Sequence, residues 1–400
     1  MKQAVMYGAG NIGRGFIGQL FYMSGYEISF VDVNQSLIDR LNGDGQYPIY
    51  ITEGESYREY LVTGVRGVNG FDTEAIAQAI EKADVMATAV GVNVLGKIAA
   101  PIARGIARRM EMGVEQPLNI IVCENMIGAD AYLAGEIKKY LRDAEQDYFD
   151  AHVATVEPSI GRMVPATPEH LKEKHPLAVC VEPYCELPVD RDAFVGEIPP
   201  IVNLQPFSPF DFHIRRKLFM HNMSHALTAY FGALQGYTYI WEVAEDRAIQ
   251  GLVRKALAEA SQALSCEYGV PIEELLSFGE QLIERFQNRL LGDTIERVGR
   301  DTKRKLASND RFVATAQLCQ KHGIVPVHVL AGLAAGLHFA PDGDSASHEV
   351  VTDLAQNGLV HTLEHYCGID CDSSFIPVIE SVYHQIQNGK TAQEIAKALS

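Results

Sequence analysis

A segment in the second half of the chain carries several side chains that can exchange protons. Lys217, His221, Asn222 and His225 fall within nine consecutive residues. On an α-helix, at about 100° per residue, they would point at about 0°, 40°, 140° and 80°. Oxidation of an alcohol needs a base for the hydroxyl proton and donors that hold the developing alkoxide while hydride leaves. The opposite arc of this helix is apolar and consists of Phe219, Met220, Met223, Ala226 and Leu227.

The same helix allows two other interpretations. A lysine on a helix surface is usually solvated, and it acts as a base only if burial and nearby positive charge lower its pKa. His221 and His225 are four residues apart, which suits zinc, but no third ligand at a suitable spacing and no His-Glu-x-x-His motif accompanies them. Cys367 and Cys371 beside His365 also lack a second ligand pair. We therefore predict no metal site.

The N-terminus contains a glycine pattern between a strand-like run and a helical segment. Gly8, Gly10 and Gly13 form G-x-G-x-x-G, in which the glycines allow a tight turn, close approach of a pyrophosphate and close packing of helix on strand. Asp32 ends the next strand-like segment, where a carboxylate binds ribose hydroxyls and repels a 2′-phosphate. The pattern predicts NAD in preference to NADP, although a glycine-rich turn without a ligand fits the same spacing. The predicted cofactor-binding residues are Tyr7, Gly8, Ala9, Gly10, Asn11, Ile12, Gly13, Asp32 and Val90.

The first half of the chain alternates between two kinds of segment. Short apolar runs predict strands at 3–7, 27–33, 84–90 and 118–123, and 3.6-residue periodicity predicts helices at 12–24 and 93–112. This alternation predicts an α/β fold with a Rossmann-type doubly wound sheet. Residues 84–91 resemble its fourth strand, whose end we expect to pass beneath the cofactor. Residues 46–70 interrupt the alternation, and we predict that they form an antiparallel excursion from the sheet. We predict that Arg14 is an exposed helix residue.

The second half of the chain has a different residue pattern. Prolines recur between 158 and 206 and prevent long helices there. Beyond them, apolar periodicity predicts helices at 212–234, 242–268, 271–291, 309–322 and 325–338. We predict a Rossmann-type domain over residues 1–200 and a mainly helical domain for substrate and catalysis over residues 201–400.

The composition limits the partners of the chain. The formal net charge is −17, which disfavours nucleic acid, and 47% of the residues are hydrophobic, as in a globular protein. Seven scattered cysteines are typical of reduced thiols in a cytosol. We see neither a signal peptide nor an apolar run of the roughly 18 residues that a membrane span needs. These features predict a cytoplasmic protein without a membrane partner.

The pattern Lys217-x4-Asn222-x2-His225 resembles the signature of the zinc-independent, polyol-specific long-chain dehydrogenase (mannitol dehydrogenase) family. The opening glycine-rich segment and two segments at 288–301 and 304–311 also resemble that family, in the same order along the chain. The resemblance implies that Lys217 is the general base and that Asn222 and Asn125 hold the alkoxide. It further implies that His225 binds and orients the substrate.

Within the family, the opening segment resembles most the branch that acts on a phosphorylated polyol. This implies NAD-dependent oxidation of D-mannitol 1-phosphate to D-fructose 6-phosphate, and the reverse, by a chain that we expect to be a monomer. The substrate phosphate would need cations, and the richest basic cluster contains Arg297, Arg300, Arg304 and Lys305, although a solvated helix face explains these residues as well.

Other activities remain open at this point. The branch of the family that oxidises free mannitol, or a hexuronate reductase, shares the signature. A β-hydroxyacid dehydrogenase of the 6-phosphogluconate type has Lys-x3-Asn, which would place the amide where His221 stands. A non-catalytic NAD sensor is the remaining alternative, and it would have no need for a base.

Overall fold

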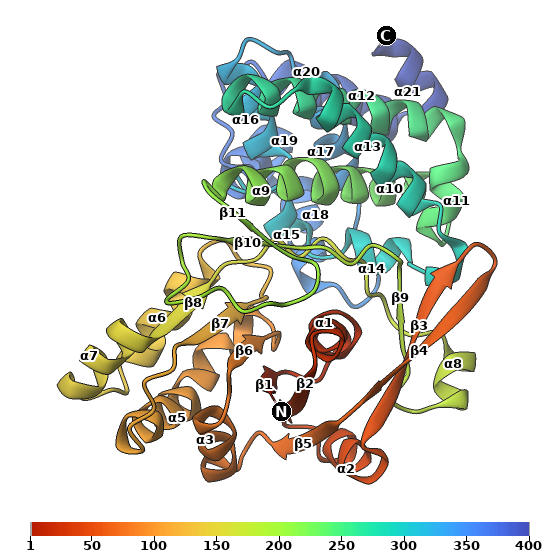
Figure 1. Ribbon diagram of the computed structural model, residues 1–400. Coiled ribbons are helices and arrows are strands. Elements are labelled where there is room, and N and C mark those ends of the chain that lie inside the picture. The colour runs from red at the N-terminus through yellow and green to blue at the C-terminus, as the bar shows by residue number, and fades with distance from the viewer. Residues whose placement is uncertain (1, 400) are drawn as a thin grey trace. The chain divides into compact units, whose positions relative to one another are not determined.

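The computed structural model describes residues 2–399 and divides into two compact units, Met1–Ile214 and Arg215–Ser400. Figure 1 follows the chain by colour and labels its helices and strands.

The first unit is built on a six-stranded parallel sheet. Its strand order is β5-β2-β1-β6-β7-β8, so the order reverses between β1 and β6. In such a sheet, ligands bind beyond the carboxyl ends of the strands next to the reversal point. The predicted Rossmann-type doubly wound sheet is thereby confirmed. The strands are β1 (Lys2–Tyr7), β2 (Tyr26–Asp32), β5 (Val65–Asn69), β6 (Val85–Thr88), β7 (Leu118–Val122) and β8 (Val153–Val156).

The sheet is covered on both faces because side chains alternate along each strand. In β1, Ala4 and Met6 join one apolar cluster, which includes Phe16 and Leu20 of the first helical segment. Val5 and Tyr7 join a second cluster with residues of α3 and α5. The helical elements of this unit are η1 (Gly13–Ile17), α1 (Gly18–Met23), α2 (Gln35–Asp44), α3 (Thr73–Glu81), α4 (Val92–Leu95), η2 (Gly96–Ile98), α5 (Ala99–Glu111), α6 (Ala129–Lys138), α7 (Asp143–His152) and α8 (Glu169–Lys174).

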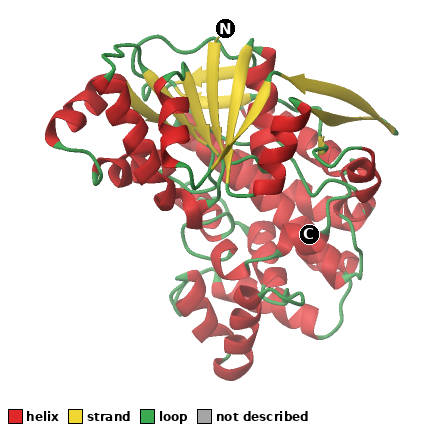
Figure 2. Cartoon of the chain, turned by 90° about the horizontal axis from the view of Figure 1, so that it is seen from below, coloured by secondary structure: helices red, strands yellow, loops and turns green. Residues whose placement is uncertain are grey.

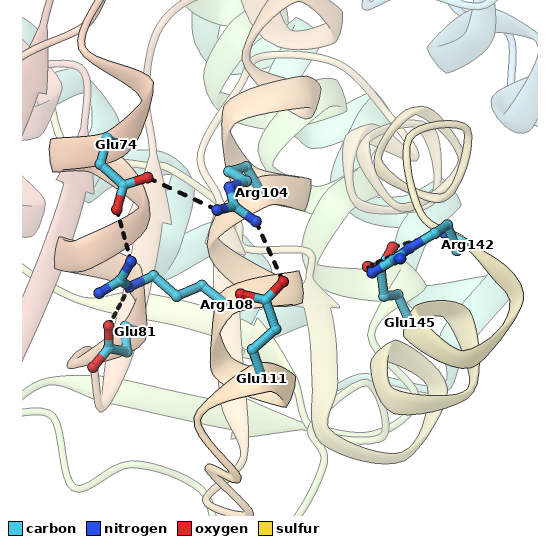
Figure 3. A network of polar contacts seen from close by, with 7 residues as sticks. All are labelled: Glu74, Glu81, Arg104, Arg108, Glu111, Arg142 and Glu145. Carbon is cyan, nitrogen blue, oxygen red and sulfur yellow. Dashed lines mark hydrogen bonds and ion pairs between the residues drawn. The ribbon is translucent and has the colours of Figure 1, made fainter.

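Helices α3 and α5 are also joined by charged side chains at their surface. Arg108 of α5 pairs with Glu74, at 2.7 Å, and with Glu81, both on α3 (Figure 3). Arg104, one turn earlier on α5, approaches Glu74 at 3.9 Å. Exposed pairs of this kind contribute roughly 0–1 kcal/mol each, so the apolar clusters supply most of the stability.

The predicted antiparallel excursion at 46–70 is correct for only part of that range. Strands β3 (Gln46–Glu53) and β4 (Ser56–Thr63) pair antiparallel, and β9 (Val179–Val181) joins β3 in parallel. The prediction is wrong for β5, which returns to the main sheet parallel to β2. β5 carries a half-buried pattern without a continuous apolar run, which is why periodicity did not reveal it. A further parallel pair joins β10 (Leu187–Asp190) to β11 (Leu204–Phe207).

The second unit is helical, as predicted. Figure 2 shows its red helices, in contrast to the yellow strands of the sheet. The predicted helix at 242–268 is two helices, because the Asp246 carboxylate accepts hydrogen bonds from the backbone of Ala248 and Ile249 and begins a new one. The elements, from the unit boundary onward, are α9 (Asp211–Arg216), η3 (Lys217–Asn222), α10 (Met223–Leu234), α11 (Ile240–Glu245), α12 (Arg247–Tyr268), α13 (Ile272–Phe286), η4 (Arg289–Leu291), α14 (Ile295–Gly299), α15 (Thr302–Lys305), α16 (Val313–Lys321), α17 (Val327–Gly336), α18 (Ser345–Asn357), α19 (Leu359–Thr362), η5 (Leu363–Cys367), α20 (Ile376–Gln387) and α21 (Ala392–Ala398).

Across residues 2–399, the structure contains no helix with the length and apolar character needed to cross a membrane.

Candidate active site

The glycine loop after β1 has the geometry that a diphosphate needs. Gly8 has a φ of 101°, and a Cβ there would lie 2.4 Å from the carbonyl oxygen of Ala89. A Cβ on Gly13 would lie 1.9 Å from the carbonyl oxygen of Gly8. A Cβ on Gly10, in contrast, would meet no atom within 4 Å. Two glycines are therefore required by packing, and the third leaves open space at the start of a helix, where backbone N–H groups attract an anion.

Asp32 connects this loop to the end of β2. One carboxylate oxygen accepts a hydrogen bond from the backbone N–H of Ala9 at 2.8 Å, and the other accepts one from Asn34 at 2.9 Å. An ionised carboxylate can accept about four hydrogen bonds, so it retains capacity for the hydroxyls of a ribose. Asp32 thus orients the glycine loop and remains able to bind a sugar.

Two exposed apolar side chains next to Asp32 were not predicted from the sequence. Val33 is 61% exposed and Phe71 79% exposed, and they follow the neighbouring strands β2 and β5. The backbone N–H of Phe71 donates to the side chain of Asn69 at 2.8 Å, which fixes the turn. Apolar groups exposed together beside a polar anchor are typical of a ligand surface. Val33 and Phe71 are isolated apolar residues in loops, so they give no periodic pattern that the sequence could reveal.

Arg14 is buried, and the prediction of an exposed residue is wrong. It is 8% exposed; its Nε donates to the carbonyl oxygen of Ala9 at 2.7 Å, and its Nη1 donates to that of Leu177. Burial lowers its pKa from the ordinary value. Arg14 therefore links the glycine loop to the segment at Leu177 through its hydrogen bonds. The spacing of residues along one helix cannot reveal such a contact.

The remaining predicted cofactor residues lie in or near the loops after β1 and β6. Tyr7 and Ala9 are buried, and burial raises the pKa of Tyr7 to about 12. Asn11 and Ile12 are partly buried, and the Asn11 amide donates to the carbonyl oxygen of Pro165 at 2.9 Å. Val90 is partly buried in the loop after β6.

Asn125 lies in an exposed turn after β7, in the first unit. The preceding residue, Glu124, is buried; its carboxylate accepts hydrogen bonds from the Thr88 hydroxyl at 2.7 Å and from the Val90 N–H at 2.8 Å. Glu124 thus ties the loop after β7 to the loop after β6.

In the second unit, the helix that carries the proton-exchanging side chains is not a regular α-helix. Residues Lys217–Asn222 form a π-helical segment, and the N–H of Met223 bonds to the carbonyl of Leu218, five residues earlier. Residues five apart then stack as residues four apart do in an α-helix. Lys217 and Asn222 therefore share one face, in place of the angle of about 140° that the α-helical wheel gives.

Lys217 lies among charged residues from a later part of the chain. It is partly buried, and desolvation of its ammonium, followed by the positive charges of Arg311 and Arg304, lowers its pKa to about 8; Asp310 opposes that shift. Arg311 is buried, pairs with Asp310 at 2.8 Å and donates to the backbone carbonyl of Asn222 at 3.3 Å. Lys217 is therefore a group that loses its proton near neutral pH.

His225 is held from two sides within the same unit. Its Nε2 lies 3.3 Å from a carboxylate oxygen of Asp293, and its ring stacks on Phe286 with centroids 4.6 Å apart. Burial lowers the pKa of His225 although Asp293 opposes this. His221 is also buried, with its ring 5.8 Å from that of His225, and burial lowers its pKa well below the ordinary value. Both rings are therefore neutral at pH 7.

Asp293 anchors this arrangement. Burial alone would raise its pKa, but hydrogen bonds with His225 and Arg297 lower it to about 2. Arg297 binds both of its oxygens, at 2.6 and 2.7 Å. Asp293 lies in one of the segments that carried the family resemblance, but its spacing from the helix gave no sign that it would contact His225.

The predicted phosphate-binding cations have different surroundings. Arg297 is engaged by Asp293, and Arg304 pairs with Asp301 at 2.7 Å. Lys305 is buried and donates to a backbone carbonyl, and burial lowers its pKa well below the ordinary value. Arg300 is exposed and interacts electrostatically with Asp344.

Within residues 2–399, no group of three or more histidine, cysteine or acidic side chains is arranged to hold a metal ion.

Comparison with known proteins identifies the family. The model of the mannitol dehydrogenase Rossmann domain matches residues 2–203, and that of the mannitol dehydrogenase C-terminal domain matches residues 209–400. The chain belongs to the mannitol dehydrogenase family. It is therefore an oxidoreductase of the polyol dehydrogenase type, and the family resemblance seen in the sequence is confirmed.

Solved structures have the same fold over the whole chain. Mannitol 2-dehydrogenase of Pseudomonas fluorescens, in a ternary complex with NAD and D-mannitol, has a TM-score of 0.79 at 16% identity. That match covers 100% of this chain and 94% of the other. A D-sorbitol dehydrogenase in substrate-free form has a TM-score of 0.79 at 14% identity, with 99% and 94% covered. At such identities the likeness establishes the fold.

Proposed function

We propose that this member of the mannitol dehydrogenase family oxidises D-mannitol 1-phosphate to D-fructose 6-phosphate with NAD, and catalyses the reverse reduction. The observation that carries the chemistry is Lys217, whose pKa is lowered to about 8 by desolvation and by Arg311, on the face that also carries Asn222. A base poised near neutral pH is what removal of a hydroxyl proton requires.

Lys217 takes the proton of the substrate hydroxyl while hydride leaves the carbon that bears this hydroxyl. The side-chain amide of Asn222 donates to the oxygen on which negative charge develops, and Asn125 is proposed as a second amide for that oxygen. In reduction, protonated Lys217 returns the proton. The positive charge of Arg311 favours the neutral, basic form of Lys217 before the reaction.

His225 acts as an orienting group. With Nε2 facing the Asp293 carboxylate at 3.3 Å, a neutral ring protonated at Nε2 has Nδ1 available to accept a hydrogen bond from a substrate hydroxyl. The stack on Phe286 restricts rotation of the ring. His225 therefore selects a substrate with a hydroxyl at a defined distance from the reacting carbon.

The residues of the first unit fit NAD, which supplies the hydride acceptor when bound. The open side of Gly10 suits the diphosphate, and Asp32 suits the adenosine ribose. Val33 and Phe71 would lie against the adenine. Residues 33–35 and 69–71 contain no lysine or arginine for a 2′-phosphate, which supports NAD in preference to NADP.

The phosphorylated substrate is supported by the cations near the catalytic helix. Arg300 is exposed and interacts electrostatically with Asp344, so its charge would be shared between that carboxylate and a phosphate. Arg304 and Arg297 are partly exposed and would share their charge between acidic neighbours and the ligand.

Mannitol 2-dehydrogenase activity on free mannitol is the second candidate. It is supported by the likeness to the P. fluorescens enzyme and by the pairing of Arg297 and Arg304 with acidic side chains. A hexuronate reductase is a further activity with the same signature.

The test is NADH consumption with fructose 6-phosphate, fructose and a hexuronate as separate substrates. We expect kcat/KM to be highest for fructose 6-phosphate, and we expect Arg300→Ala to raise its KM without changing that for fructose. Equal or better use of fructose would establish the free-polyol activity instead. Activity should also survive dialysis against a chelator.

A further inference from the structure

Glu124 is a buried carboxylate with no cation beside it. It is 8% exposed, and its hydrogen bonds come from the Thr88 hydroxyl and the backbone of the Val90 loop. Over the described residues, no lysine, arginine or histidine forms an ion pair with it. A buried charge without a partner is costly, so proteins normally provide a counter-charge.

The other buried acidic residues of the described chain follow that rule. Glu145 pairs with Arg142 and Asp293 with Arg297. Arg162 interacts electrostatically with Glu182, and Arg300 with Asp344. Glu124 is therefore the exception: burial raises its pKa, hydrogen bonds from Thr88 and the backbone of Val90 oppose that shift, and no cation of the described chain neutralises its charge.

The position of Glu124 in the sheet indicates which ligand could supply a counter-charge. The order β5-β2-β1-β6-β7-β8 places the glycine loop at the reversal point and Asp32 on the side of β2 and β5. If Asp32 marks the adenosine half of a dinucleotide, the nicotinamide half extends toward β6 and β7. Glu124 follows β7 and is bonded to the last residue of β6 and to the loop beyond it.

We propose that the carboxylate of Glu124 is a specificity-determining group that favours NAD⁺ over NADH by providing negative charge beside the nicotinamide position. The oxidised nicotinamide ring carries a positive charge and the reduced ring carries none. The two cofactors are otherwise nearly identical, so a nearby negative charge stabilises one and not the other. This inference rests on the proposed use of NAD.

The Glu124 carboxylate also has a structural role, which must be distinguished from the effect of its charge. By joining the loops after β6 and β7 it positions Val90 and Asn125, and loss of that link would affect both forms of the cofactor alike. Two variants separate the effects. Glu124→Gln removes the charge and can keep both hydrogen bonds, because its oxygen accepts from Val90 and its NH₂ donates to the Thr88 hydroxyl. Glu124→Asp keeps the negative charge on a side chain that is one methylene shorter.

The experiment measures dissociation constants for NAD⁺ and NADH by calorimetry and by NADH fluorescence, without substrate. For Glu124→Gln we expect NAD⁺ affinity to fall on the order of tenfold, as for loss of one partly screened charge, with NADH affinity unchanged. For Glu124→Asp we expect both affinities to fall together and their ratio to stay as in the wild type. Glu157→Gln is the matched control, because Glu157 is a partly buried carboxylate directly after β8, one strand further along, and accepts a hydrogen bond from the backbone N–H of Gly128 at 2.9 Å.

An unchanged ratio in Glu124→Gln, with both cofactors still bound, would overturn this inference and leave the proposed function intact. If Glu124→Gln does not fold, a changed ratio in Glu124→Asp overturns it. Wild-type protein that binds neither NAD⁺ nor NADH would contradict the proposed function itself.

Discussion

The glycine loop and the catalytic helix begin from equally short sequence patterns, but they depend on the rest of the chain in different ways. The function of the loop depends on its backbone: neighbouring backbone atoms leave no room for a Cβ at Gly8 and Gly13, and Gly10 leaves open space for a ligand. The helix works through side chains whose properties come from residues far along the chain. Lys217 depends on Arg311, and His225 depends on Asp293. A binding site formed by the backbone can therefore be predicted from residue spacing, whereas the chemistry of a side chain depends on its tertiary contacts.

Lys217→Ala gives the largest expected effect on the helix side of this comparison. We expect kcat to fall about a thousandfold, within the range for loss of a general base, with NADH affinity unchanged. Steady-state kinetics and a binding titration measure the two quantities. Lys303→Ala is the control, because Lys303 is an exposed helix lysine paired with Glu349. Retention of most activity in Lys217→Ala would contradict the assignment of Lys217 as the base.

Two glycine variants separate packing from binding on the loop side. Gly13→Ala forces a Cβ against the carbonyl of Gly8 and should lower the free energy of unfolding by about 1–3 kcal/mol. Gly10→Ala meets no protein atom and should leave the thermal midpoint unchanged while weakening NAD binding. Calorimetric unfolding and a binding titration on both variants test this, and equal destabilisation would contradict the account of the loop.

Asp32→Ser should have a smaller effect on the same loop. It removes the acceptor for Ala9 and Asn34 and the repulsion of a 2′-phosphate. We expect NAD affinity to fall and discrimination against NADP to relax. Unchanged affinity for both cofactors would rule out the assignment of Asp32.

The smallest expected effect concerns the charges around Lys217. Arg304 is 45% exposed and helps to lower the pKa of Lys217. Arg304→Gln should therefore raise that pKa slightly and shift the pH dependence of oxidation toward higher pH. The measurement is kcat/KM for the alcohol against pH, and a shift toward lower pH would contradict the assigned sign.

What the sequence revealed follows the same division. Strand and helix alternation predicted the parallel sheet, and the glycine spacing predicted the loop, because both depend on local patterns. The return of β5 to the sheet, the burial of Arg14 and the partners of Lys217 depend on segments far apart in the chain. The π-helical turn at Lys217–Asn222 was missed as well, because a wheel of 3.6 residues assumes the regularity that this segment lacks.

The pH dependence of hydride transfer in wild-type protein and Lys217→Ala tests the central claim most directly. Single-turnover formation of NADH isolates the chemical step from product release. Lysine is basic only above its pKa, so we predict a wild-type rate that rises with pH around a midpoint near the Lys217 pKa of about 8, and a slow, pH-independent rate in the variant. The same midpoint in the variant would show that another group is the base.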